Sequence, residues 1–263
     1  MLGWALPRRP GTFPEQIQVT LAAIASKPDG IAINYYGKPF EDSTSKALDA
    51  AITVVLYNNN QLDGENLPTD SRIRRLAFIG QDESKSGEAL AAAFVPTLPR
   101  GTAVLLINPF PQSHVLKVRR DAVASALDAA GLPYADLNMD NSGDEGKYLS
   151  IIGPYLATHS EIGAVIGMGN PGSNPAAKYV SDNHLSYPIA TFDVGPTTAT
   201  YIQQGVVSLA INQQPFLQGY MSIVNLALAL KFGFTPVNVN TGTSVVNRSN
   251  VEAVLRLIAQ GKG

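Results

Sequence analysis

The sequence has no cysteine, which rules out structural disulfides, thiol nucleophiles and thiolate metal sites. Charged residues are also sparse, at 15% of the chain. The Lys and Arg residues are scattered rather than gathered into a basic stripe, so nucleic acid is not an expected partner. No apolar run reaches the roughly 18 residues that a membrane helix needs.

Metal-binding and secretion motifs are missing as well. The three histidines, His114, His159 and His184, lie far apart, and neither an H-E-x-x-H motif nor an Asp-rich run occurs. We therefore expect no metal ion and no cofactor. The opening residues, MLGWALPRRPGTFPE, do not combine a basic start with an apolar stretch of about 7–15 residues, as a signal peptide would. The chain as written is therefore expected to stay in the cytoplasm.

What the sequence does contain is typical of a folded α/β protein. Hydrophobic residues make up 45% of 263 residues, and the net charge is −2. Strand-like and helix-like stretches alternate, most clearly with a strand at 187–192, a helix at 197–204, a strand at 206–211 and, after Pro215, a helix at 216–230. Other strands are expected at 30–34, 52–57, 76–80, 102–107, 134–139 and 162–167, and a helix at 174–183. This alternation predicts doubly wound parallel sheets.

The number of predicted strands favours two lobes over one. About ten strands would be unusual for a single open sheet. We expect an N-terminal lobe from residues 1–81 and 214–240, and a C-terminal lobe from residues 82–213 and 241–263. A multi-strand hinge near Asp82, Pro215 and residues 241–244 would join them.

Polar and aromatic side chains follow most of the predicted strands. In open α/β sheets, ligands bind at the carboxyl ends of the strands. Amides and carboxylates hydrogen-bond hydroxyl pairs, and aromatic faces pack on the C–H surface of a sugar, so the set favours a neutral polyol. For any single residue, the turn and capping preferences of Asn and Asp give an alternative explanation. The set consists of Tyr35, Tyr36, Asn58, Asn59, Gln81, Asp82, Asn108, Phe110, Asn170, Asp193 and Gln213.

Six segments have an order and spacing that together are specific. They are KPDGIAI (27–33), ALDAAITVVLYNN (47–59), LAFIGQDESKSGEALAAAF (76–94), KVRRDAVASALDAAG (117–131), IATFDVGPT (189–197) and INQQPFLQG (211–219). With them the chain resembles, from about residue 11 to 246, the sugar-binding family of type I periplasmic solute receptors. Ribose-binding protein and the sugar-binding cores of LacI-type repressors are relatives of that family.

The resemblance implies a two-lobed receptor that closes on a small sugar, delivers it to an ABC transporter permease and catalyses nothing. By position it implies sugar contacts from Asn58 and Asn59 in the first lobe, and from Asn170, Asp193 and Gln213 in the second. Lys117 lies near a position where the family often has Arg. Asn34, Tyr35 and His114 are looser matches.

The start of the chain departs from the family. We expect the first βα unit to be missing and only the strand that follows it to be present, at residues 2–6. The strand at 30–34 would then have an uncovered apolar edge, which is prone to association. We therefore expect a rearranged first lobe or a homodimer through this edge, and sugar affinity that is impaired.

Two other functions remain open at this point. Gly167, Gly169 and Gly172 fit G-x-G-x-x-G between a strand and a helix, and Asp193 ends the next strand, as in an NAD-dependent oxidoreductase. Pro171 and Pro175 make a phosphate-binding turn awkward there. The chain also resembles the effector-binding core of a LacI-type regulator, although no helix-turn-helix precedes it.

Overall fold

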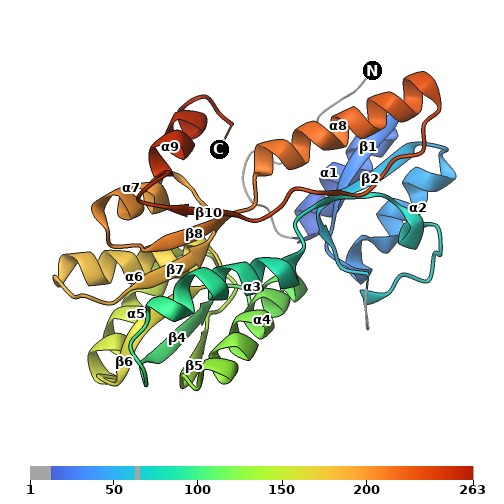
Figure 1. Ribbon diagram of the computed structural model, residues 1–263. Helices are drawn as coiled ribbons and strands as arrows, with labels where there is room; N and C mark the ends of the chain where they lie inside the picture. The colour runs from blue at the N-terminus through green and yellow to red at the C-terminus, as the bar shows by residue number, and fades with distance from the viewer. Residues whose placement is uncertain (1–12, 63–65, 263) are drawn as a thin grey trace. The chain divides into compact units, whose positions relative to one another are not determined.

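The computed structural model describes residues 13–62 and 66–262, and the chain divides into two units, each built around its own β-sheet (Figure 1). The first unit comprises the chain up to Gln81 together with Pro215–Thr241, and the second comprises Asp82–Gln214 and the chain from Gly242 onward. The strand expected at residues 2–6 lies outside the described residues. The α/β architecture with parallel sheets confirms the predicted fold class.

The first unit contains a sheet of four parallel strands in the order β1-β2-β3-β9. β1 is therefore at the edge of the sheet among the described strands. The strands are β1 (Gly30–Tyr35), β2 (Thr53–Asn60), β3 (Phe78–Gly80) and β9 (Val239–Asn240), and the helices are α1 (Phe13–Ala25), α2 (Glu41–Asp49) and α8 (Pro215–Phe232).

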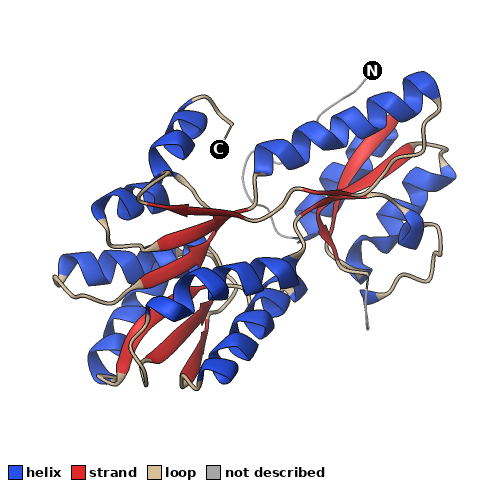
Figure 2. Cartoon of the chain, in the orientation of Figure 1, coloured by secondary structure: helices blue, strands red, loops and turns tan. Residues whose placement is uncertain are grey.

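Helices cover both faces of this sheet, which is why its strands are rich in Val, Ile and Leu. On one face, Ile33 and Leu56 pack in a core with Ile17 and Ile24 of α1. On the other face, residues such as Val55 and Ile79 pack with Leu226 of α8. The layered arrangement is visible in Figure 2.

The second unit contains a six-stranded sheet in the order β10-β8-β7-β6-β4-β5. Only β10 is antiparallel to its neighbour. The strands are β4 (Ala103–Asn108), β5 (Tyr134–Asn138), β6 (Ile162–Gly167), β7 (Ile189–Phe192), β8 (Leu209–Asn212) and β10 (Ser244–Asn247). The helices are α3 (Glu83–Phe94), α4 (His114–Ala130), α5 (Glu145–Thr158), α6 (Asn170–Asp182), α7 (Pro196–Gln204) and α9 (Val251–Ala259).

Two hydrophobic clusters lie on opposite faces of this second sheet. In one cluster, Leu90 and Phe94 of α3 pack with Val123 and Leu127 of α4. The two helices approach closely because Gly87 has no side chain: a Cβ built there would lie 2.6 Å from the Cβ of Ala122. This contact brings the first turn of α3 beside the middle of α4.

Several element boundaries differ from the sequence-based expectation: β2 continues to Asn60 rather than 57, β3 begins at Phe78 rather than 76, and β7 begins at Ile189 rather than 187. Two other differences bear on the polar residues that follow the strands. α6 begins at Asn170 rather than 174, because the backbone N–H groups of Gly172 and Ser173 already donate to the carbonyl of Gly169. β8 begins at Leu209 rather than 206, because the N–H groups of Val206 and Val207 donate to the carbonyl of Tyr201 and close the end of α7. Asn170 is consequently the first residue of a helix.

Among the described residues, no helix combines the length and the hydropathy that crossing a membrane requires. In each unit the carboxyl ends of the parallel strands lie along the same side of the sheet, as the sequence predicted. The polar side chains that follow the strands gather at those two edges.

Candidate functional site

A chain of hydrogen-bonded amides runs along the carboxyl ends of the first unit's strands. Asn59, on β2, donates from Nδ2 to Asn34 Oδ1 at 2.8 Å and to Asn58 Oδ1 at 2.7 Å. Asn58 Nδ2 donates to Gln218 Oε1 on α8 at 3.0 Å. Asn34 Nδ2 donates to the Tyr36 hydroxyl at 3.1 Å. Side chains from β1, β2 and α8 are thereby fixed relative to one another.

The backbone at Asn58 supports this arrangement. Its φ of 60° lies in the left-handed region, where a non-glycine residue is uncommon and Asn is among the most tolerated. Gln218, which accepts from Asn58, is buried, and its Nε2 lies 3.5 Å from the hydroxyl of Thr241. A network of this kind holds its amides in one orientation before any ligand arrives.

Two half-buried tyrosines lie at the same edge of the first unit. Burial raises the pKa of both Tyr36 and Tyr57, and the nearby Tyr36 adds to the effect at Tyr57. Both phenols therefore stay neutral near pH 7. They offer an apolar ring and a hydroxyl group, as the aromatic part of a sugar site requires.

Tyr35, by contrast, is placed in the hydrophobic core. Its side chain is fully buried with Ile33, Phe40 and Leu56. Burial raises the pKa of Tyr35, and the carboxylates of Glu41 and Asp70 add to that rise. Within the described part of the chain its hydroxyl has no hydrogen-bond partner. Alternation along β1 directs Tyr35 inward and leaves Tyr36, the next residue, at the polar edge.

In the second unit, Asp193 and Gln213 come together after β7 and β8. Gln213 donates from Nε2 to Asp193 Oδ1. Asp193 also has a left-handed backbone, with φ of 71°, and its N–H donates to the carbonyl of Ile211 at 2.8 Å. Gly169 lies beside this carboxylate: a Cβ built at Gly169 would be 3.4 Å from Asp193 Oδ2, an ordinary contact distance.

Asn170 lies beside this pair, and its amide is oriented by a second network. Thr198 Oγ1 donates to Asn170 Oδ1 at 2.7 Å and lies 3.0 Å from Asn174 Oδ1. Asn174 Nδ2 donates to Glu145 at 2.9 Å. Because Oδ1 of Asn170 accepts from Thr198, its Nδ2 is on the side of Gly195, 3.2 Å from the Cβ position of that glycine.

A buried ion pair adjoins the same strand ends. Arg119 of α4 donates from Nε to Glu83 Oε2 and from Nη2 to Glu83 Oε1, the latter at 3.2 Å. Its guanidinium carbon lies 4.8 Å from the ring centroid of Phe192. Burial raises the pKa of Glu83, and the positive charge of Arg119 opposes that rise.

Two further residues of the expected site, Lys117 and His114, lie on α4. Lys117 is exposed and forms an ion pair with Asp121 one turn further along α4. His114 is half-buried and begins α4. The structure thus brings Asn58 and Asn59 together in the first unit and Asn170, Asp193 and Gln213 in the second.

The glycine-rich turn has a packing role. A Cβ at Gly167 would lie 2.7 Å from the Cβ of Ser173, and one at Gly172 would lie 2.9 Å from Ile107. These glycines let α6 lie close to β6 and β4. The first N–H groups of α6 beyond the turn, those of Gly172 and Ser173, bond to the Gly169 carbonyl. They are therefore not presented together to a pyrophosphate.

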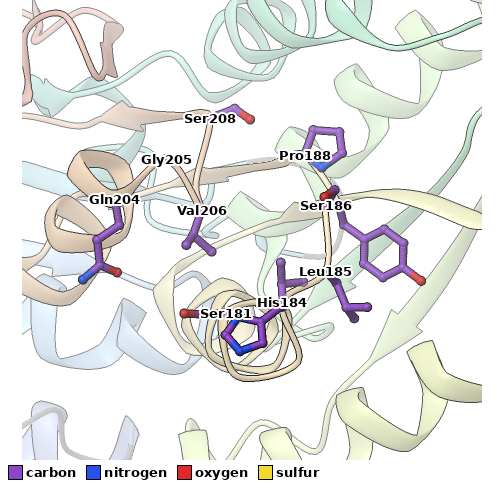
Figure 3. Close-up of a pocket in the computed structure, with 11 residues that line it drawn as sticks. Ser181, His184, Leu185, Ser186, Pro188, Gln204, Gly205, Val206 and Ser208 are labelled. Atoms are coloured by element: carbon purple, nitrogen blue, oxygen red, sulfur yellow. The ribbon is translucent and has the colours of Figure 1, made fainter.

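The second unit also has a pocket of about 520 Å³ at the amino ends of its strands β7 and β8. Figure 3 shows its lining, which includes His184, Ser186, Val206 and Ser208. These residues precede β7 and β8, whereas Asp193 and Gln213 follow them. The pocket is therefore separate from the polar set. Among the described residues, no group of three or more His, Asp or Glu side chains is arranged so that it could hold a metal ion.

Residues 7–233 match the family described as the periplasmic binding protein domain. The chain belongs to this family, whose members are periplasmic. It is 27% identical over 256 residues to the xylose/arabinose-binding protein XylF of Sulfolobus acidocaldarius, covering 89% of this chain. The match covers 60% of that relative, so the chain spans less than two thirds of its length.

Solved structures give the same result. A carbohydrate transporter from Acidothermus cellulolyticus, in complex with myo-inositol, is 27% identical with a TM-score of 0.78, covering 95% of this chain and 86% of that one. A periplasmic sugar-binding protein of an ABC transporter from Legionella pneumophila is 25% identical, also with a TM-score of 0.78, covering 89% and 85%. The resemblance inferred from the sequence is thereby confirmed.

Sequence reasoning missed three residues of these networks: Gln218, which bonds Asn58, Thr198, which bonds Asn170, and Arg119, which pairs with Glu83. Gln218 and Thr198 lie within helices and follow no strand, so a search of strand ends passes over them. Arg119 is two residues from Lys117, and only the helical phase of α4 decides which of these cations is buried. An ionisable residue in the middle of an amphipathic helix was the available signal.

Proposed function

We propose that this chain binds a small neutral sugar or polyol, without transforming it, as the solute-binding component of an ABC-type carbohydrate transporter. The observation that carries the proposal is the pair of preorganised polar sets at the strand ends of the two units. One consists of Asn34, Asn58, Asn59 and Gln218, and the other of Asn170, Asp193 and Gln213.

The chemistry of these sets fits an uncharged ligand with several hydroxyl groups. Amides both donate and accept, and a carboxylate accepts strongly, so together they match hydroxyls, which do both. Asp193 would repel an anionic ligand. Arg119, the cation nearest to it, is already paired with Glu83. The relatives support this reading, since one is named for xylose and arabinose and another contains myo-inositol.

Two further parts of the proposal concern partners. Delivery of the sugar to a transporter permease follows from the family alone. A homodimer through β1 has one supporting observation: among the described strands, β1 is at the sheet edge. Sedimentation at high protein concentration tests the dimer, and a monomer there would remove it.

Calorimetric titration with pentoses, hexoses and polyols tests the proposed function. We expect one sugar per chain, and we expect Asp193→Ala to lower its affinity at least about tenfold, since a hydrogen bond to a charged group contributes roughly 1.5–3 kcal/mol. Asp182→Ala is the matched control, because Asp182 pairs with Lys178 on the surface of α6. Unchanged affinity in Asp193→Ala would remove Asp193 from the site. A folded chain that binds none of these sugars would refute the function.

A further inference from the structure

The end of α8 and the loop that follows it form an exposed apolar surface. Leu228, Phe232, Phe234 and Val237 are 40%, 59%, 60% and 61% exposed. The N–H of Val237 donates to Asn225 Oδ1 at 2.9 Å, which returns the loop to the side of α8 that carries Leu228 and Phe232. Single exposed apolar residues are common, but a contiguous group marks an interaction surface. We call these four exposed residues the amino-end patch.

The amino-end patch lies at the end of the first unit where the parallel strands begin. α8 runs back along the sheet, so that a Cβ built at Gly30, the first residue of β1, would lie 3.3 Å from Leu230. The loop after α8 then leads into β9, whose neighbour is β3. The N–H of Phe78, the first residue of β3, donates to Asn238 Oδ1 in this loop at 2.8 Å. The segment before β3, at 73–77, therefore lies beside the loop.

Cations without a carboxylate partner gather at the same end of the unit. Of the lysines and arginines described in the first unit, Lys38, Lys46 and Arg72 each form an ion pair. The others have no ion pair with a carboxylate of the described chain: Lys27, Arg74, Arg75 and Lys231.

The position of these four cations follows from the order of the elements. Lys27 precedes β1, Arg74 and Arg75 precede β3, and Lys231 is in the last turn of α8. The carboxylates of Asp49 and Asp70 are bound to Arg72. Within the described chain, only Asp29 adds a further negative charge before these strands. Positive charge is therefore in excess beside the amino-end patch.

The charge decides which partner fits the amino-end patch. A second copy that docked by the same surface would bring like charges together, which disfavours a two-fold interface. A negatively charged surface would complement the cations. An anionic membrane offers phosphate groups to lysine and arginine, and directly below them an apolar layer in which phenylalanine side chains are buried. Both features of this end of the unit are then satisfied by one partner.

We propose that the amino end of the first unit docks on the surface of an anionic lipid membrane. Phe232 and Phe234 enter the boundary between headgroups and acyl chains, and Arg74, Arg75 and Lys231 bind the headgroup phosphates. This inference is independent of the proposed function. The polar set of Asn58 and its neighbours is at the carboxyl ends of the same strands, so docking leaves it uncovered.

Cosedimentation of the full chain with lipid vesicles tests the proposal. One set of vesicles is phosphatidylcholine with about 30% phosphatidylglycerol, and the other is phosphatidylcholine alone. We expect binding to the anionic vesicles at about 100 mM NaCl, at least about tenfold weaker binding to the neutral ones, and a steep loss at about 1 M NaCl, where charges are screened.

Two double variants separate the apolar from the electrostatic contribution. Phe232→Ser with Phe234→Ser removes the rings, and Arg74→Gln with Arg75→Gln removes two charges. We expect each to lower binding to the anionic vesicles at least about tenfold, since a cation near such a surface contributes about fivefold and two buried rings contribute more. All four side chains are exposed, so we expect Tm to stay within a few degrees of wild type.

Matched controls change the same residue types elsewhere. Phe216→Ser with Tyr220→Ser removes two exposed aromatic rings at the opposite end of α8. Lys85→Gln with Lys147→Gln removes two exposed charges from the second unit. Both control variants should bind the anionic vesicles as the wild type does.

Three results would overturn the inference. The first is a folded chain that does not bind the anionic vesicles, and the second is a loss of binding that is as large in the controls as in the patch variants. The third is self-association without vesicles that Phe232→Ser with Phe234→Ser abolishes, because the patch would then be a contact between copies of the chain. None of these measurements uses a sugar, so they are decided separately from the proposed function.

Discussion

Two residues of the polar sets, Asn58 and Asp193, share a left-handed backbone although neither is glycine. Such a conformation costs of the order of 1–2 kcal/mol for most residues, and it persists where surrounding contacts determine it. At Asn58 those contacts are hydrogen bonds to Asn59 and Gln218. Asn58 lies within β2, near its carboxyl end and where the pairing with β1 shifts register, and this conformation places its amide in the network.

Substitutions at Asn58 can separate the backbone from the side chain. Asn58→Gly accepts the left-handed conformation freely but removes the amide, so we expect stability within about 1 kcal/mol of wild type and a loss of about tenfold in sugar affinity. Asn58→Ala should lose the same affinity and more stability. Chemical denaturation and calorimetric titration measure the two effects.

Ala51→Gly is the matched control for this pair. Ala51 is also left-handed, with φ of 57°, but it is exposed and follows α2. We expect the glycine variant to keep wild-type sugar affinity and to be up to about 1 kcal/mol more stable. If Asn58→Gly keeps its affinity, the Asn58 amide does not contact the sugar.

At the scale of elements, Glu41 ties α2 to the segment before β3. Its Oε1 accepts from the backbone N–H groups of Thr69 at 2.7 Å and Asp70 at 2.9 Å. Its Oε2 pairs with Lys38 at 2.7 Å. Hydrogen bonds from Lys38, then from Thr69 and Asp70, lower the pKa of Glu41 to about 2. The irregular segment at residues 67–72 is thereby fixed to α2.

This arrangement predicts a pH dependence of stability. Because the pKa of Glu41 is lower in the folded than in the unfolded chain, its contribution is complete above about pH 4.5 and falls as the pH approaches 2. Glu41→Gln should lower stability at pH 7 by on the order of 1–2 kcal/mol. The difference from wild type should shrink between pH 4.5 and 2.

Thermal unfolding at several pH values measures this difference. Asp42→Asn is the control, since Asp42 is the next residue and its partner Lys46 is exposed. A gap between wild type and Glu41→Gln that is constant from pH 7 to pH 2 would contradict the assigned role of the carboxylate.

At the scale of the whole molecule, the chain passes between its two units at Gln81–Asp82, Gln214–Pro215 and Thr241–Gly242. Each unit has its own sheet and its own core. A ligand that contacts the polar sets of both units must therefore stabilise both, whereas a ligand of one unit stabilises only that unit. Measuring which units are stabilised therefore shows which units the ligand contacts.

We expect a bound sugar to slow hydrogen exchange both at 58–61 and at 193–196. At 100 times its Kd it should add about 2.7 kcal/mol to the free energy of unfolding. The pocket segment 184–188 serves as the control and should not respond, because it lies at the opposite strand ends. Unchanged exchange at both segments in the presence of a saturating sugar would contradict a role for these polar residues in binding it.

The sequence by itself determined the class of fold and the family. Alternating apolar strands and amphipathic helices require parallel sheets covered on both faces, and residues that follow such strands meet at one edge. Asn58, Asn59, Asn170, Asp193 and Gln213 were found in this way, because their position depends on topology alone. Whether they bind sugar remains a prediction.

Only the tertiary structure decided which neighbouring side chain faces the edge and which supports it. Tyr35 is buried while Tyr36 is at the edge, and Arg119 is buried while Lys117 is exposed. Which residue of each pair is buried depends on which face the strand or helix turns toward the elements packed on it. That orientation is set by long-range packing, such as the contact of Gly87 with α4, and a local pattern of residues does not contain it.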